Sequence, residues 1–140
     1  MNIAPAPPAP QPPPVPQPQA NQVVNIWLSN QNGSNGVGRV PNIVGYLQVL
    51  ANHPMFAKFL GNLNKSFFDQ YGLSFNFQDL PQGYTLWWKA RRGNPTNQQG
   101  QVQGAFFVYG HPRGRFESAS TFAVHVNSMR TGLNCVCRRC

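Results

Sequence analysis

The chain contains very few acidic side chains. Its 140 residues hold three of them, Asp69, Asp79 and Glu117, against eleven lysines and arginines, which gives a formal net charge of +8. These carboxylates are far apart in the sequence, and no nucleophile motif or phosphate-binding glycine loop is present. We therefore expect no enzymatic activity and no small-molecule substrate. The excess of positive charge instead favours polyanionic partners.

Long apolar runs are also lacking. No stretch approaches the roughly 20 residues that span a bilayer, and the N-terminus has no basic start followed by an apolar segment. We expect no membrane association. Without an export signal, the cysteines are expected in a reducing compartment, as thiols or metal ligands rather than as disulfides.

The cysteines are few and lie together within the last six residues, as Cys135, Cys137 and Cys140. Zinc takes four ligands, commonly thiolates and imidazoles, and the C-x-C and C-x-x-C spacings both suit it. The fourth ligand is left open between His111, His125 and a group beyond residue 140. The alternative is three free thiols on a frayed terminus.

The N-terminal part of the chain is poor in residues that form regular structure. Residues 1–20 are mostly proline, alanine and glutamine, which predicts a disordered, polyproline-like tail. Its PxxP spacings suit an aromatic groove on another protein, although a plain solubilising tail is the favoured interpretation. Residues 21–40 are interpreted as a linker or a short strand over 23–29 that adds to the main sheet.

Helical spacing of apolar residues dominates 41–72. Ile43, Val44, Leu47 and Leu50 fit a first helix, and a second is expected to begin at Pro54. Asn52 or His53 would cap the second helix and Gly72 would end it. Its apolar stripe consists of Met55, Phe56, Phe59, Leu60, Leu63, Phe67 and Phe68, and should back a sheet.

A β-hairpin is expected after the helices. Residues 84–90 and 104–109 read as strands, and the polar stretch 95–100 between them would project as a mobile finger. Glycine and proline over 110–114 indicate a tight turn. A short third strand over 115–117 and a helix that begins at Ser118 or Ser120 would follow.

Four motifs together resemble a known domain. They are LPQGY (80–84), the basic step RRG (91–93), YGHPRG (109–114) and RFES (115–118). Their order resembles the methyl-CpG-binding domain. With CVCRRC at 135–140, the segment 80–140 is similar to the N-terminal region of the fungal cryptic loci regulator family, which consists of heterochromatic transcription-silencing proteins.

The apolar spacing over 41–72 and the resemblance over 80–140 together predict an α+β fold, in which a small antiparallel sheet, as hairpin plus helix, packs against N-terminal helices. We expect one domain over 41–140, with helices over 41–72, and the resemblance implies a methyl-CpG-binding-like core over 80–130. Arg91 matches the first of the two arginines that read methylated CpG in that domain family. The other reading positions fall on Glu117, Val108 and Phe106, so recognition of methyl-CpG is not expected.

The resemblance and the charge together imply a nuclear, non-enzymatic silencing module that binds DNA through phosphates without methyl-CpG specificity. The residues expected to contact DNA are Lys89, Arg91, Arg92, Arg113 and Arg115. The alternative is a protein-docking module of a silencing complex of the histone deacetylase type. A third interpretation is a truncated paralogue that retains the fold.

Overall fold

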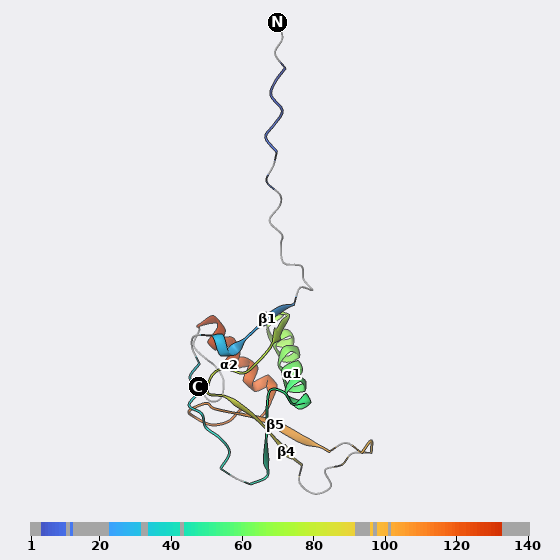
Figure 1. The fold of residues 1–140 in the computed structure, drawn as a ribbon, viewed down its shortest axis with the longest axis vertical. Helices are drawn as coiled ribbons and strands as arrows, with labels where there is room; N and C mark the ends of the chain where they lie inside the picture. Colours follow the sequence, from blue (N-terminus) through green and yellow to red (C-terminus); the bar gives the residue numbers. More distant parts are fainter. Residues whose placement is uncertain are drawn as a thin grey trace.

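The computed structural model describes residues 4–10, 12, 23–31, 34–42, 44–91, 96, 98–100 and 102–132. These residues form the predicted α+β fold, with two helices and two small sheets (Figure 1). The elements in chain order are β1 (Val24–Ile26), a 3₁₀ turn (Leu28–Asn30), β2 (Tyr46–Val49), α1 (Pro54–Tyr71), β3 (Phe75–Phe77), β4 (Thr85–Ala90), β5 (Gly104–Tyr109) and α2 (Ala119–Thr131). Neither helix has the length and apolarity needed to cross a membrane.

Helix α1 begins and ends at the residues that the sequence indicates. The Nδ1 atom of His53 accepts a hydrogen bond from the Met55 amide at 3.1 Å, and Pro54 occupies the first helical turn. Gly72 ends the helix in the left-handed conformation, with φ of +68°. These local signals suffice because capping depends on neighbours in sequence.

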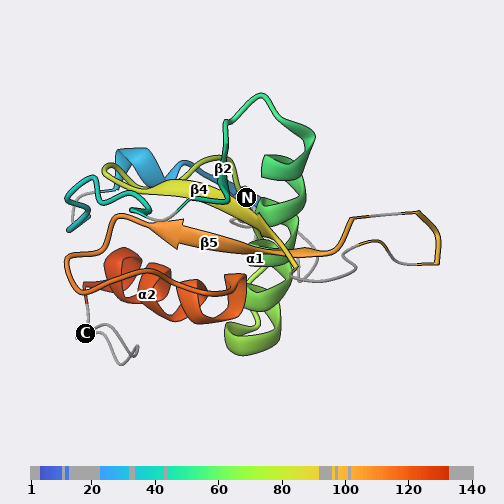
Figure 2. The same cartoon turned by 90° about the horizontal axis from the view of Figure 1, so that it is seen from below.

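The hydrophobic core lies between the helices and one face of the three-stranded sheet. Figure 1 shows α1 and α2 on the same side of β4 and β5, and in Figure 2 β5 passes in front of α1. Phe59 of α1 contacts Phe106 and Phe122, with ring centroids 5.6 and 6.5 Å apart. The largest fully buried side chains are Phe59, Phe67, Phe77, Phe116, Phe122, Leu28, Leu63, Leu86, Val108 and Val126.

The main sheet is antiparallel and has the order β2-β4-β5. Leu86 pairs with Val108 and Trp88 with Phe106, and these residues face the helices. Since side chains alternate along a strand, the intervening residues face away from the helices. The predicted hairpin is thus confirmed, and a third strand joins it at β4.

The helix predicted from the first apolar repeat of 41–72 is wrong. Residues Tyr46–Val49 form strand β2, paired with Leu86–Lys89 of β4. Leu47 and Leu50 are exposed rather than aligned on a buried helical face. Four residues are too few to distinguish the two periods, and pairing with a distant strand decides between them.

The expected third strand over 115–117 is reduced to a single bridge. Phe116 and Val108 exchange two backbone hydrogen bonds, each 2.9 Å long, and no ladder extends from them in the described chain. Helix α2 then begins after Ser118, whose Oγ accepts from the Thr121 amide at 3.2 Å. The predicted serine cap is confirmed.

The strand expected within 23–29 exists, but it joins a different sheet. Strand β1 pairs in parallel with β3 and not with the hairpin. The Ser29 amide donates to Oδ1 of Asp79 at 3.1 Å, and Asn64 of α1 accepts from the Phe77 amide at 2.8 Å. These polar contacts attach the small sheet to the core.

Several predictions fall on residues outside the described part of the chain. They concern Arg92, residues 95 and 97 of the predicted loop over 95–100, and the cysteine cluster at 135–140. Most of the tail over 1–20 is likewise outside it, and the described residues 4–10 form no helix or strand.

Candidate interaction surface on the outer face of the sheet

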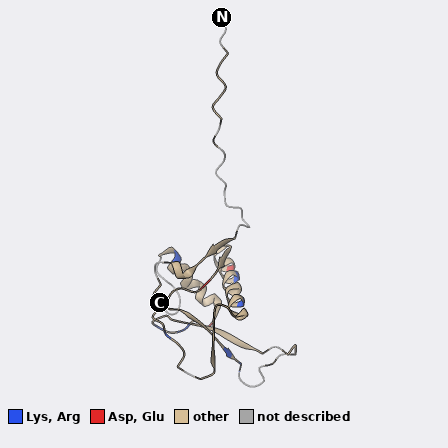
Figure 3. Ribbon diagram, viewed as in Figure 1, with Lys and Arg blue, Asp and Glu red and all other residues tan. Residues whose placement is uncertain are grey.

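The sheet face opposite the helices combines aromatic rings with cations. We call it the outer face. Its side chains come from alternate positions of the three strands, as the register shows. They are Tyr46, Gln48, Thr85, Trp87, Lys89, Ala105, Phe107 and Tyr109. Figure 3 shows the described lysines and arginines on several elements, one of which is β4.

Arg115 lies across the centre of this face. Its guanidinium carbon is 4.3 Å from the Phe107 ring centroid and 5.6 Å from that of Tyr46. The guanidinium donates hydrogen bonds to the hydroxyls of Tyr46 and Tyr109, the latter at 3.0 Å. Arg115 thereby links β2 to β5 from outside the sheet. Its side chain is 30% exposed.

The electrostatics of this cluster follow from burial and from the charge of Arg115. Burial acts to raise the pKa of Tyr46, but the hydrogen bond from Arg115 and the nearby cations outweigh it and lower that pKa. For Tyr109 the effect of burial outweighs the hydrogen bond from Arg115, and the pKa of Tyr109 is raised. Burial acts to lower the pKa of Arg115, but its tyrosine partners raise it. Arg115 is therefore a permanent cation.

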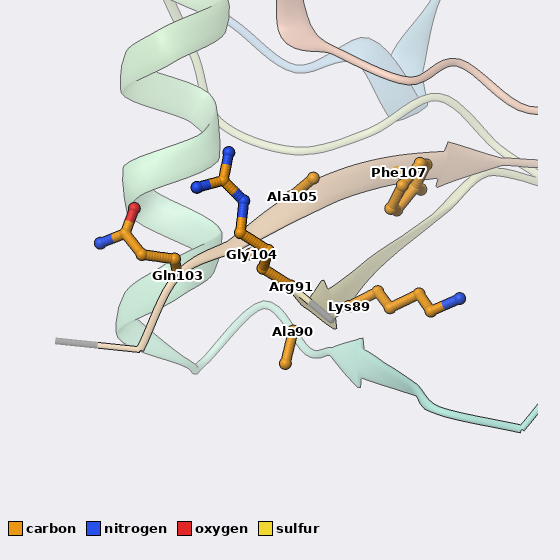
Figure 4. A pocket seen from close by; sticks show the side chains of 7 residues that line it. All are labelled: Lys89, Ala90, Arg91, Gln103, Gly104, Ala105 and Phe107. Carbon is orange, nitrogen blue, oxygen red and sulfur yellow. The ribbon is translucent and has the colours of Figure 1, made fainter. Parts of the chain in front are cut away.

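A second cation, Lys89, lies beside the cluster. Its Nζ atom is 5.0 Å from the Tyr46 ring centroid. Lys89 and Arg91 also line an open hollow at the end of β4 and β5, together with Gln103 and Phe107 (Figure 4). In Figure 4 the Lys89 and Arg91 side chains extend in different directions from the strand. This hollow continues the outer face toward the hairpin tip.

The opposite end of the face holds another cation. Arg39 lines a hollow with Tyr109 and Gly114. Arg113 lies in the turn that follows β5, where its amide donates to Nδ1 of His111 at 3.0 Å. Sequence reasoning missed Arg39, because residue 39 comes near the sheet only through the fold.

The predicted DNA-contacting residues therefore have different surroundings in the structure. Lys89 and Arg91 share one hollow, whereas Arg115 is largely engaged by aromatic rings and by Glu117, whose Oε1 is 3.8 Å from its Nε. Tyr109 and Trp87 contact each other on the outer face, with ring centroids 6.5 Å apart.

Two of the positions aligned with methyl-CpG-reading residues, Val108 and Phe106, lie away from the outer face. Val108 is fully buried, and Phe106 contacts Phe59 in the core. Neither side chain reaches the outer face. The structure thus gives a physical reason for the expected loss of methyl-CpG specificity, which itself stays a prediction.

Two histidines named as candidate zinc ligands lie in the core. The ring centroids of His111 and His125 are 5.0 Å apart, and both residues are 3% exposed. Nε2 of His125 is 3.0 Å from the Tyr84 hydroxyl and 3.2 Å from Oδ1 of Asn35. Burial and the neighbouring His111 lower the pKa of His125 to about 4. Both rings pack in the core. No cluster of three metal-ligating side chains occurs among the described residues.

The fold and this face define a small α+β domain with a basic, aromatic sheet surface. Residues 75–140 match the family model of the transcription-silencing protein cryptic loci regulator Clr2. This segment of the chain is therefore similar to the cryptic loci regulator family, as its motifs predict.

A solved structure extends the likeness beyond that segment. The fold is similar to a chain in the structure of Clr2 bound to the Clr1 C-terminus, with a TM-score of 0.55 and 14% sequence identity. The match covers 76% of this chain and 27% of that chain, so the present sequence corresponds to about a quarter of the longer protein. No curated protein matches the sequence.

Proposed function

We propose that this chain is a nuclear, non-enzymatic docking module of a transcription-silencing assembly, and that it binds a protein partner through the outer face. The observation that carries the proposal is the cluster of Tyr46, Phe107, Tyr109 and Arg115, with Lys89 beside it, on a face that neither helix covers. Tyrosine, phenylalanine and arginine are enriched at protein interfaces. The family match over residues 75–140 and the Clr1 segment in the similar structure support a silencing partner.

The charge of the face indicates the chemistry of the partner. Lys89, Arg91 and Arg39 line hollows on or beside it, and Glu117 supplies the acidic group that contacts Arg115. An acidic segment complements this surface, whereas a basic one is repelled. Arg115 has a structural role in this arrangement, since it holds the aromatic rings in place.

The test is binding of a labelled C-terminal segment of a Clr1-type protein from the same organism. The variant Lys89→Glu with Arg91→Glu should weaken binding by about tenfold or more, because like charges then meet at the interface. The matched control, Lys58→Glu with Lys65→Glu, makes the same change in net charge on exposed positions of α1. An equal loss in both variants would show that only the overall charge matters. No binding by the unaltered chain would refute the docking proposal.

A second candidate function is phosphate binding to DNA. It is favoured by Lys89 and Arg91 lining one hollow and by Arg39 at the other end of the face. Titration of methylated and unmethylated duplexes at two salt concentrations tests it. Binding that is steep in salt and equal for both duplexes supports DNA contact through phosphates. Absence of binding at low salt removes this candidate and leaves protein docking.

A further inference from the structure

Strand β2 is an edge of the main sheet, and among the described residues its one neighbour is β4. The strand is short, but its sequence, YLQV, contains neither a charge nor a proline, which are two of the usual devices against unwanted pairing. Leu47 within the strand is 65% exposed, and Val44 just before it is 96% exposed. An uncharged, apolar edge of this kind is a site for another strand.

The phase of the hydrogen bonds shows which backbone groups face outward. The Arg91 amide donates to the Gln103 carbonyl at 2.7 Å. In an antiparallel pair every second residue bonds to the same neighbour, so Lys89, Trp87 and Thr85 of β4 bond to β5. The residues between them, Leu86 and Trp88, bond to β2 at Val49 and Leu47. Tyr46 and Gln48 therefore direct their amide and carbonyl groups toward the open edge, and no other backbone partner of either is found in the described chain.

We propose that an extended segment of a partner protein adds to the sheet along β2, with acidic and apolar side chains alternating. This inference deepens the docking function proposed above and rests on it. Main-chain hydrogen bonds to Gln48 would supply affinity, and the two faces of the strand would supply selectivity. We call the backbone of Tyr46 and Gln48, with the exposed Leu47 side chain, the β2 edge.

Charge complementarity selects the occupant. On the outer side, Lys89 extends toward β2, because its Nζ lies over the Tyr46 ring and its Cε is 3.9 Å from the Cβ position of Gly45. An acidic side chain on the added strand would meet this ammonium group. On the inner side, an apolar side chain would cover Leu47. A second copy of this chain is disfavoured, because it would bring two Lys89 groups to the same edge.

A groove at the C-terminal end of β2 offers a further apolar contact. It is lined by residues on both sides of the strand end, including Leu50, Phe56 and Leu80. Leu50 is exposed, whereas Phe56 and Leu80 belong to the core. A strand laid along the β2 edge would end over this groove.

The test uses the full chain and a labelled heptapeptide of alternating glutamate and valine. Binding should slow hydrogen exchange of the Gln48 amide by about tenfold or more and leave the Leu47 and Val49 amides, already bonded to β4, nearly unchanged. A heptapeptide with lysine in place of glutamate should bind about tenfold more weakly. Unchanged exchange at Gln48 with bound peptide, or equal affinity for the two peptides, would overturn the inference.

A matched pair of variants isolates the backbone group. Gln48→Pro removes the outward amide and leaves the hydrogen bonds to β4, since proline is tolerated on the open side of an edge strand. Gln48→Ala removes the same side chain and keeps the amide. We expect peptide affinity to fall about tenfold in the proline variant and to change less than about twofold in the alanine variant. If the proline variant does not fold, the exchange measurement on the unaltered chain still decides.

Two other outcomes have a definite meaning. Protection of the Gln48 amide without peptide, together with dimers in sedimentation, would assign the edge to a second copy and overturn the partner segment. A chain that binds the Clr1-type segment through Lys89 and Arg91, but leaves Gln48 open to exchange with either ligand, would keep the docking function and refute the β2 edge as its site.

Discussion

The guanidinium of Arg115 stacks on the ring of Phe107, with 4.3 Å between the guanidinium carbon and the ring centroid. Phe107 belongs to β5, and Arg115 lies beyond the turn that follows it. Through its bond to the Tyr46 hydroxyl, the same guanidinium also reaches β2. One cation thus ties both edges of the sheet across its outer face.

Replacement of Arg115 by lysine should destabilise the domain, although the charge is kept. A lysine lacks the planar group that stacks on Phe107 and bonds to two hydroxyls at once. We expect a loss of about 1–2 kcal/mol in the free energy of unfolding, measured in urea. The control Arg91→Lys, at an exposed position, should change it by less than about 0.5 kcal/mol. Equal values would mean that charge alone matters at residue 115.

Replacement of Gly110 by alanine should be severely destabilising. Gly110 has φ of +140°, and an added Cβ would lie 2.3 Å from the Gly83 carbonyl oxygen. Backbone strain and the clash together should cost about 3 kcal/mol or more. At Gly61 in α1 an added Cβ meets nothing within 4 Å, so Gly61→Ala should stabilise by about 0.5–1 kcal/mol. Thermal unfolding of both variants checks the contrast.

Stability should fall in mildly acidic solution because of His125. The unfolded chain binds a proton at this residue near pH 6.5, whereas the folded chain does so only near pH 4. The contribution of neutral His125 is therefore complete well above pH 6.5 and is lost as the pH falls toward 4, by about 3 kcal/mol. Urea titrations at several pH values should show this loss in the natural chain and a smaller one in His125→Gln. The same slope in both would assign the effect to other groups.

Replacement of Asn64 by alanine should loosen the small sheet. Its Oδ1 accepts from the Phe77 amide at 2.8 Å, and its Nδ2 donates to Asn76 at 3.1 Å. Loss of these bonds should cost about 1–2 kcal/mol and speed hydrogen exchange at Phe77. Asn62→Ala, at an exposed position of the same helix, should leave both quantities nearly unchanged. Unaltered exchange at Phe77 in the Asn64 variant would contradict the assigned role.

The candidate site could be predicted only in part. Lys89 and Arg91 are near one another in sequence, on a hairpin whose strands follow from composition alone, and Arg115 follows the turn after the second strand. Arg39 and Tyr46 could not be assigned to the same face from sequence. Tyr46 joins it by pairing with a strand about forty positions away, and Arg39 approaches Tyr109, about seventy positions away. The role of Arg115 as an internal link, rather than an exposed cation, likewise required the positions of three rings.

The sequence by itself determined the features that depend on near neighbours. These are the ends of α1 at Pro54 and Gly72, the serine cap of α2, the two hairpin strands and the motifs of the silencing family. Tertiary structure alone decided that 46–49 is a strand, that β1 pairs with β3, and which rings surround Arg115. The physical reason is that capping and turn energies act within a few residues, whereas short strands gain stability only from distant partners.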